Sequence, residues 1–243
     1  MIEFNEVTRR FGKKTAVDDL NLSIEPGELF ALLGPNGAGK TTTIKMLVGL
    51  LRPSQGTVSV FGNDLSREPR RAAGCIGYVP DQPFLYNKLS GREFLDFVGE
   101  MRGLDRRTRQ ERIERESENF DLDAFIDNLA ETYSHGMKQR TVFASAMLHD
   151  PAALVIDEPM VGLDPRSMRL VKDLLRQRAN EGTIIFMSTH TLAVAEEIAD
   201  RIGIVTQGRL HFNGTLEELR GEFAGGNDSL ESLFLEMTND DNR

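Results

Sequence analysis

The sequence of 243 residues contains a single cysteine and no tryptophan. One thiol, at Cys75, excludes an internal disulfide bond and is typical of proteins from a reducing compartment. We expect Cys75 to be a small buried apolar residue rather than a reactive thiol. Disulfide-stapled secreted folds are therefore excluded as a class.

Long hydrophobic runs are also missing. No stretch reaches the ~18 consecutive apolar residues of a transmembrane helix. The N-terminal residues Met1–Glu6 are acidic and lack the apolar centre of a secretory signal. We therefore expect a soluble intracellular chain. If the protein works at a membrane, another chain has to supply the part that spans it.

Positive charge is in deficit, with 29 Lys and Arg against 38 Asp and Glu and a net charge of −9. No basic patch dominates, so nucleic acid is not expected as the main partner. Apolar residues make up 40% of the chain, which is enough for a sizeable core. The length suits one large domain, or one domain that carries an inserted subdomain.

A glycine-rich loop follows the apolar run Leu29–Leu33 and opens into a predicted helix at Thr42–Leu51. Glycines let the backbone curl so that successive N–H groups point at phosphate oxygens, and the helix N-terminus behind them adds partial positive charge. Lys40 can reach the outer phosphates, and the Thr41 hydroxyl can ligate magnesium. The candidate nucleotide-binding residues are Gly34, Pro35, Asn36, Gly37, Ala38, Gly39, Lys40, Thr41 and Thr42.

Short apolar runs bounded by turn residues alternate with segments of helical periodicity. This alternation predicts an α/β fold with a mostly parallel sheet covered on both faces. The predicted strands are Ile2–Phe11, Leu20–Ile24, Leu29–Leu33, Val58–Phe61, Ile76–Val79, Ala153–Ile156, Thr183–Met187, and a hairpin of Ile202–Val205 with Arg209–Phe212. Helices are predicted between them at Met168–Ala179 and Leu192–Ala199.

The segment from about residue 86 to 149 interrupts this alternation and predicts a helical insertion. Its expected helices are Arg92–Arg102, the densely charged and therefore solvated Asp105–Asn119, a short one at Asp123–Glu131, and Met137–His149. We expect a single domain over 1–223, with its core in 1–85 and 150–223. Residues 224–243 are expected to form a flexible joint and a short final helix.

Two acids stand where a buried strand is predicted to end, at Asp157 and Glu158. Ligands of doubly wound sheets bind at the carboxyl ends of strands. Asp157 is placed to bind magnesium and Glu158 to orient or deprotonate an attacking water, although two acids that merely cap a strand end remain an alternative. His190 follows another strand beside Ser188 and Thr189 and is a candidate γ-phosphate contact. Lys40, Glu158 and His190 are thus the candidate catalytic residues.

A second candidate anion site lies at the start of the helix predicted from Met137. Ser134 stands where an N-cap belongs, and Gly136 allows a ligand to approach the backbone closely. Taken alone, a capped helix explains the pattern equally well. The chain thus has two candidate phosphate-binding surfaces for one nucleotide, which suggests a site that is completed by a second copy or another partner.

These motifs, in this order and over almost the whole length, resemble those of the nucleotide-binding subunits of ATP-binding cassette (ABC) transporters. The resemblance identifies residues 34–41 as the Walker A loop, Asp157 and Glu158 as the Walker B aspartate and catalytic glutamate, and Gly162–Asp164 as the D-loop. It identifies Ser134–Gln139 as the signature and His190 as the switch histidine. It also implies that Phe11 stacks on adenine, and that the fold is a RecA-like P-loop NTPase with an antiparallel β subdomain and an inserted α-helical subdomain.

Two positions depart from the family pattern. The usual Leu-Ser-Gly-Gly signature reads Tyr133-Ser134-His135-Gly136, so His135 adds bulk and a titratable group that is expected to alter dimer affinity or its pH dependence. The Q-loop glutamine aligns with Asp81, which can bind metal through water, while Gln82 substitutes if the register slips by one residue.

The resemblance implies an ATPase that binds ATP and Mg²⁺ and powers export through a separate integral membrane permease. It implies a dimer with a second cassette, identical or different, and a location on the cytoplasmic face of the cell membrane. Two alternatives stay open: a soluble cassette ATPase acting on ribosomes or DNA, and a regulatory nucleotide-binding module with weak hydrolysis. The sequence does not name the cargo.

Overall fold

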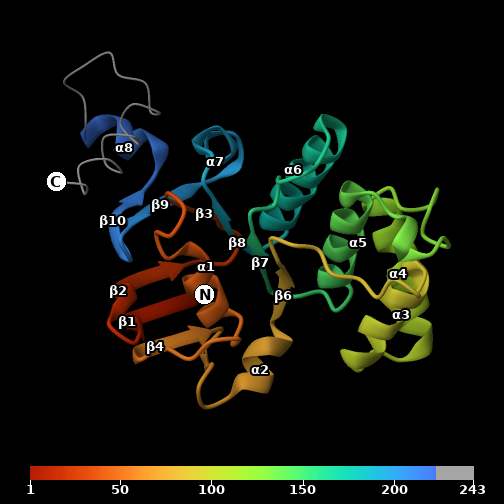
Figure 1. Cartoon of the computed structure of the whole chain (residues 1–243), viewed down its shortest axis with the longest axis horizontal. Helices are drawn as coiled ribbons and strands as arrows, with labels where there is room; N and C mark the ends of the chain where they lie inside the picture. Colours follow the sequence, from red (N-terminus) through yellow and green to blue (C-terminus); the bar gives the residue numbers. More distant parts are fainter. Residues whose placement is uncertain (223–243) are drawn as a thin grey trace.

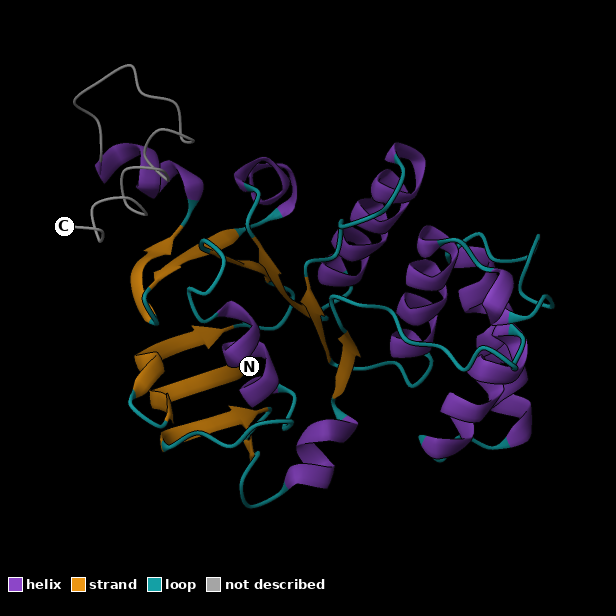
Figure 2. Ribbon diagram, viewed as in Figure 1, coloured by secondary structure: helices purple, strands orange, loops and turns teal. Residues whose placement is uncertain are grey.

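The computed structural model describes residues 1–222, and the expected joint and final helix at 224–243 lie outside this range. Two sheets form the body of the molecule (Figures 1 and 2). The larger has the strand order β10-β9-β3-β8-β7-β6, and the smaller has the order β2-β1-β4-β5. None of the helices formed by residues 1–222 is both long and apolar enough to cross a membrane.

The larger sheet is parallel except for one edge strand. The parallel strands are β3 (Leu29–Leu33), β6 (Ile76–Val79), β7 (Ala153–Asp157), β8 (Ile184–Thr189) and β9 (Arg201–Thr206), with β10 (Arg209–Gly214) antiparallel at one edge. Every residue of β3, β7 and β8 is buried, as expected for parallel strands covered on both faces. The register pairs Leu33 with Thr189 and Asp157 with Ser188, so the three strands end at one edge.

The two faces of β3 show how the layers form. Leu29, Ala31 and Leu33 belong to the core shared with α6 (Pro165–Asn180) and α7 (Leu192–Ile198). Phe30 and Leu32 belong to the core shared with α1 (Lys40–Leu47) and the smaller sheet. Because successive side chains of β3 point to opposite faces of the sheet, this one strand contributes to both layers of the fold.

The smaller sheet is antiparallel and consists of β1 (Ile2–Phe11), β2 (Lys14–Ile24), β4 (Gln55–Val60) and β5 (Asn63–Asp64). The α/β P-loop fold with an antiparallel subdomain is thus as expected, but β2 begins six residues before the predicted Leu20. In its first half, residues 14–19, Val17 is the one buried residue and there is no apolar run, and this half is held by pairing with β1.

Helices α3 (Gly91–Met101), α4 (Arg106–Asn119) and α5 (His135–Met147) lie between β6 and β7 in the chain and gather at one side of the molecule (Figure 1). The remaining helical elements are α2 (Pro69–Gly74), the 3-10 turn η1 (Ala130–Thr132) and α8 (Leu216–Glu222). The division of the chain into core and insertion at residues 85 and 150 stays a prediction.

The short helix expected at Asp123–Glu131 is wrong, because this stretch consists of turns followed by η1. Its carbonyls bind groups from outside the stretch. The Tyr133 hydroxyl donates to the Phe125 carbonyl at 2.9 Å, and the Arg92 N–H donates to the Ile126 carbonyl at 2.9 Å. A regular helix would direct the Ile126 carbonyl to the Ala130 N–H, which donates instead to the Leu89 carbonyl at 2.8 Å.

The charged helix α4 is solvated over only part of its surface. Glu116 is fully buried and pairs with Arg115 at 2.7 Å and with Arg178 of α6 at 3.3 Å. This buried pair joins the inserted helices to the central layer. A run of charges in the sequence does not distinguish such a paired carboxylate from a solvated one.

Candidate nucleotide-binding site

The glycine-rich loop has the curled backbone that its sequence predicts. Gly37 and Gly39 have φ values of 84° and 114°, in the left-handed region that favours glycine. Gly39 is the N-cap of α1, and a Cβ there would lie 2.5 Å from the Ala16 carbonyl oxygen of β2. Gly34 is buried against Val205, behind the loop. The loop is therefore fixed by close backbone contacts on two sides.

Lys40 is buried beneath this loop, with 6% of its surface exposed. Its Nζ donates to the carbonyls of Gly34 at 2.7 Å and Pro35 at 3.2 Å. Burial lowers the pKa of Lys40, and the negative charges of Glu158 and Asp157 oppose that lowering. The ammonium group therefore lies where the loop curls, between backbone oxygens and the acids at the end of β7.

Asp157 is the last residue of β7 and is 1% exposed. Ser188 of β8 donates its hydroxyl to Asp157 Oδ1 at 2.5 Å and accepts the Glu158 N–H at 3.1 Å. Asp157 Oδ2 has no hydrogen-bond partner among the described residues. A buried carboxylate oxygen left without a donor is a fitting ligand for a hard cation.

Glu158 connects the other two candidate catalytic residues. Its Oε1 lies 3.8 Å from Lys40 Nζ, and its Oε2 lies 2.9 Å from His190 Nδ1. The backbone of Glu158 has φ of 51°, an uncommon value for a residue with a side chain and one that often marks functional sites. The structure thus brings Lys40, Glu158 and His190 together.

A pocket of about 380 Å³ opens above the loop. Asp81 lines it, whereas Gln82 does not, and Asp81 Oδ1 accepts the Gln82 N–H at 2.9 Å. Burial, followed by the negative charges of Asp157 and Asp81, raises the pKa of Tyr78 to about 12. The lining residues are Phe11, Lys14, Ala16, Asn36, Gly37, Ala38, Gly39, Lys40, Thr41, Thr42, Asp81 and Glu158.

Magnesium fits this donor set if phosphate and water oxygens complete its coordination. Within residues 1–222, no group of three or more His, Cys, Asp or Glu side chains would hold a metal ion alone. Asp157 Oδ2 and the Thr41 hydroxyl are oxygen donors of the kind that magnesium prefers, and magnesium commonly takes only one or two protein ligands beside a phosphate.

The second predicted anion site does not line this pocket. Ser134 is the N-cap of α5 and accepts the Met137 N–H at 3.3 Å. A Cβ on Gly136 would lie about 4.0 Å from Asp164 Oδ2. Within one chain, the N-terminus of α5 is therefore separate from the pocket above the glycine-rich loop.

The sequence did not reveal the place of His135. Its Nε2 lies 3.3 Å from the Val161 carbonyl oxygen, and its ring lies so close to Gly162 that any side chain there would overlap it. Gly162 also has φ of 75°. The imidazole thus packs on the loop that follows the acids, within the same chain.

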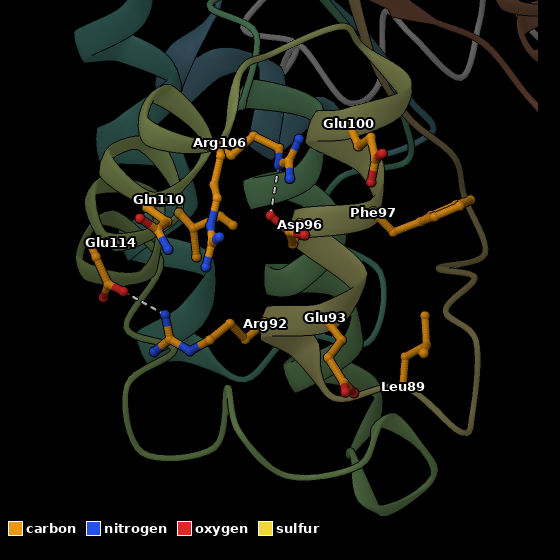
Figure 3. Close-up of a pocket in the computed structure, with 11 residues that line it drawn as sticks. Leu89, Arg92, Glu93, Asp96, Phe97, Glu100, Arg106, Gln110 and Glu114 are labelled. Carbon is orange, nitrogen blue, oxygen red and sulfur yellow. Dashed lines mark hydrogen bonds and ion pairs between the residues drawn. The ribbon is translucent and has the colours of Figure 1, made fainter.

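A larger groove of about 1000 Å³ lies between α3 and α4 (Figure 3). Arg92 pairs with Glu114 across it at 2.5 Å, and Arg109 pairs with Asp96 at 2.7 Å. The groove contains none of the residues that the sequence nominated as functional. Size alone therefore does not identify the site with the chemistry.

The curled loop between β3 and α1, with acids at the end of β7 on the far side of β8, defines a P-loop nucleotide-binding protein. The family model described as ABC transporter matches residues 17–161. The probable multidrug ABC transporter ATP-binding protein YbhF of Escherichia coli (strain K12) is 35% identical over 243 residues, and this chain spans 42% of its length. The ABC-type transporter ATP-binding protein EcsA of Bacillus subtilis (strain 168) is 31% identical over 241 residues, with 98% of its length covered.

A solved structure described as the ATP-binding subunit of an ABC transporter superposes with a TM-score of 0.91 at 32% identity. The superposition covers 98% of this chain and 99% of that one. The chain therefore belongs to the ABC transporter family.

Proposed function

We propose that this chain is the ATP-hydrolysing subunit of an exporter and works with a separate membrane permease and a second cassette. The observation that carries the hydrolytic part is the placement of Glu158 between Lys40 and His190, beside a curled phosphate loop. The likeness to a protein named as a probable multidrug transporter component supports the export direction.

Each residue of the pocket takes a distinct role in this proposal. Residues 34–42 bind the phosphates, and Lys40 exchanges its two loop carbonyls for phosphate oxygens. Glu158 orients the attacking water and accepts its proton. His190 holds Glu158 through Nδ1 and contacts the γ-phosphate. The Phe11 ring stacks on the base.

Asp157, Thr41 and, through water, Asp81 hold Mg²⁺ in this proposal. The partnerless Asp157 Oδ2 supports this assignment, and the Ser188 hydroxyl fixes the carboxylate that would bind. Magnesium would supply positive charge that offsets the charge developing on the outer phosphates.

The second cassette supplies the N-terminus of α5. Ser134 and Gly136 do not line the pocket of their own chain, and α5 begins with N–H groups suited to an anion. We infer that Ser134 and Gly136 contact the γ-phosphate of a nucleotide held by the partner. His135 does not block this contact in our proposal, because its ring packs on Val161 and Gly162.

The permease docks beside Asp81 in this proposal, and the chain is thereby held at the cytoplasmic face of the membrane. Phe84 is 67% exposed and meets Tyr86 edge-on at 5.4 Å, and Tyr86 meets Phe97 at 5.7 Å. An exposed aromatic cluster is a common mark of a protein interface. Its place a few residues after Asp81 would couple the nucleotide pocket to the permease.

A mild-detergent pull-down of the tagged chain from its native membranes tests this function. We expect a polytopic membrane protein at matched stoichiometry, and we expect Phe84→Asp to lose it while still binding ATP. Leu50→Asp is the matched control, since Leu50 is 66% exposed but lies beyond α1, outside this cluster. Recovery of ribosomal or other soluble partners alone, with the chain absent from membranes, would support the soluble-cassette alternative instead.

A further inference from the structure

Arg9 and Phe11 lie on the same face of β1, because side chains two residues apart in a strand point the same way. The Arg9 guanidinium carbon lies 4.5 Å from the centroid of the Phe11 ring, a cation–π distance. Nη1 of Arg9 donates to the Arg52 carbonyl at 2.8 Å. This hydrogen bond helps to hold the guanidinium group in place.

The contact buries part of a charged group. Nε of Arg9 is buried and has no hydrogen-bond partner among the described residues. Phe11, in contrast, is 47% exposed and lines the pocket above the glycine-rich loop. One face of the ring is thus covered by Arg9, and the exposed part of the ring belongs to the pocket.

The hairpin that carries Phe11 is fixed to the phosphate loop. Phe11 pairs with Lys14 across a two-residue turn, and the ladder then skips Ala16, which has no partner in β1. The carbonyl of this bulged residue is the atom that would lie 2.5 Å from a Cβ on Gly39. The distance between the aromatic ring and the phosphate loop is therefore set by packed backbone.

We propose that Arg9 is a positioning residue for the nucleotide base. Its guanidinium group backs the inner face of Phe11, so that the ring is held in place and offers its other face to a purine. The cation also draws electron density from the ring, which strengthens stacking of a base on the opposite face. This inference rests on the proposed function, because it assumes that the pocket takes ATP.

Calorimetric titration of the full chain with Mg-ATP and with Mg-tripolyphosphate tests this role. Arg9→Met keeps most of the side-chain volume and removes the guanidinium group. We expect it to raise the Kd for ATP about threefold to tenfold and to leave the Kd for tripolyphosphate unchanged. Arg10→Met is the matched control, since it removes an equal charge from the next residue, whereas the cation–π contact with the Phe11 ring comes from Arg9.

A double-mutant cycle distinguishes an effect of Arg9 that acts through the Phe11 ring from a direct effect of its positive charge on ATP binding. In a Phe11→Ala background, we expect Arg9→Met to have no further effect on ATP binding. Equal weakening of ATP and tripolyphosphate, or additive effects of the two substitutions, would overturn the inference. Failure of the wild-type chain to bind ATP would instead overturn the proposed function.

A second measurement uses the lack of tryptophan in the chain. Phe11→Trp places the sole tryptophan in the pocket, and selective excitation of tryptophan separates its emission from that of the three tyrosines. We expect ATP to quench the tryptophan fluorescence strongly when Arg9 is present. With Arg9→Met added, we expect the same quenching to require higher ATP concentrations. An identical titration curve for the two proteins would contradict a role for Arg9 at the base.

Discussion

The loop at residues 34–41 and the N-terminus of α5 are both helix starts that offer backbone N–H groups to an anion, yet their surroundings differ. In the loop, Lys40 lies beside Asp157 and Glu158, and the loop backbone packs against Ala16 and Val205. The start of α5 has Ser134 as its cap and lies outside the pocket. One surface therefore has a lysine and acids beside it within the chain, and the other lies apart from them.

This difference separates binding from turnover. A pocket with its lysine, acids and aromatic residue in one chain is expected to bind ATP as a monomer. Hydrolysis, in contrast, is expected to require the α5 N-terminus of a second chain. Removal of a phosphate-binding group from the glycine-rich loop should therefore weaken ATP binding, whereas a substitution at the start of α5 should slow hydrolysis and leave ATP binding unchanged.

The largest effect is expected from Glu158→Gln. The amide cannot accept a proton from water, so we expect phosphate release at saturating Mg-ATP to fall by about 10²- to 10⁴-fold. The Kd for ATP should change little, because Lys40 and the loop remain. Phosphate release and equilibrium binding are measured on the same preparation. Normal turnover by this variant would refute the role of Glu158.

A smaller effect is expected from Ser134→Ala. We expect about a tenfold loss of turnover with unchanged ATP binding to the isolated chain, because the hydroxyl acts on the nucleotide of the partner. Loss of a helix cap also costs about 1 kcal/mol of stability. Ser90→Ala is the control, since Ser90 caps α3 in the same way and accepts the Glu93 N–H at 3.2 Å. Equal losses of turnover in both variants would mean that only capping matters.

The smallest effect concerns the other end of α5. His149 follows this helix, and its Nε2 lies 3.0 Å from the Ile76 carbonyl oxygen of β6. Burial, and then the positive charge of Arg102, lowers the pKa of His149 to about 4. Between about pH 6.5 and 4 the unfolded chain binds this proton and the folded chain does not, so stability falls as pH is lowered through this window.

Thermal unfolding between pH 7 and 5 measures this effect. We expect the melting temperature of His149→Gln to fall less with pH than that of the wild type, because glutamine keeps a donor for the Ile76 carbonyl and does not titrate. Parallel pH profiles of the two proteins would show that His149 does not contribute.

Local patterns predicted the fold class and the glycine-rich loop of the pocket, whereas Lys14 and Ala16, which also line it, were not predicted. The apolar runs of β3, β7 and β8 and the glycines of the loop carry their signals in a few consecutive residues. The register of the parallel sheet then gathers their carboxyl ends, so Lys40, Glu158 and His190 meet as strand-end reasoning expects.

The features that the sequence did not reveal depend on distant partners. Glu116 looks like one more charge on a solvated helix until Arg178 of α6 is placed beside it. The stretch 123–131 has helical spacing, but its carbonyls bind Tyr133 and Arg92. Cys75 is only partly buried, so the prediction that it is a buried apolar residue is wrong. The contact of His135 with Gly162 and that of Arg9 with Phe11 likewise arise from packing.

Mixing two impaired variants tests the central claim that each site is completed by a second copy of the chain. Lys40→Ala removes the lysine of one pocket, and Ser134→Ala removes the cap of one α5. A mixed pair retains one site that has both its lysine and the partner's serine. We predict that the mixture hydrolyses ATP clearly faster than the sum of the two variants measured alone. Turnover no greater than that sum would contradict a site shared between two copies of this chain.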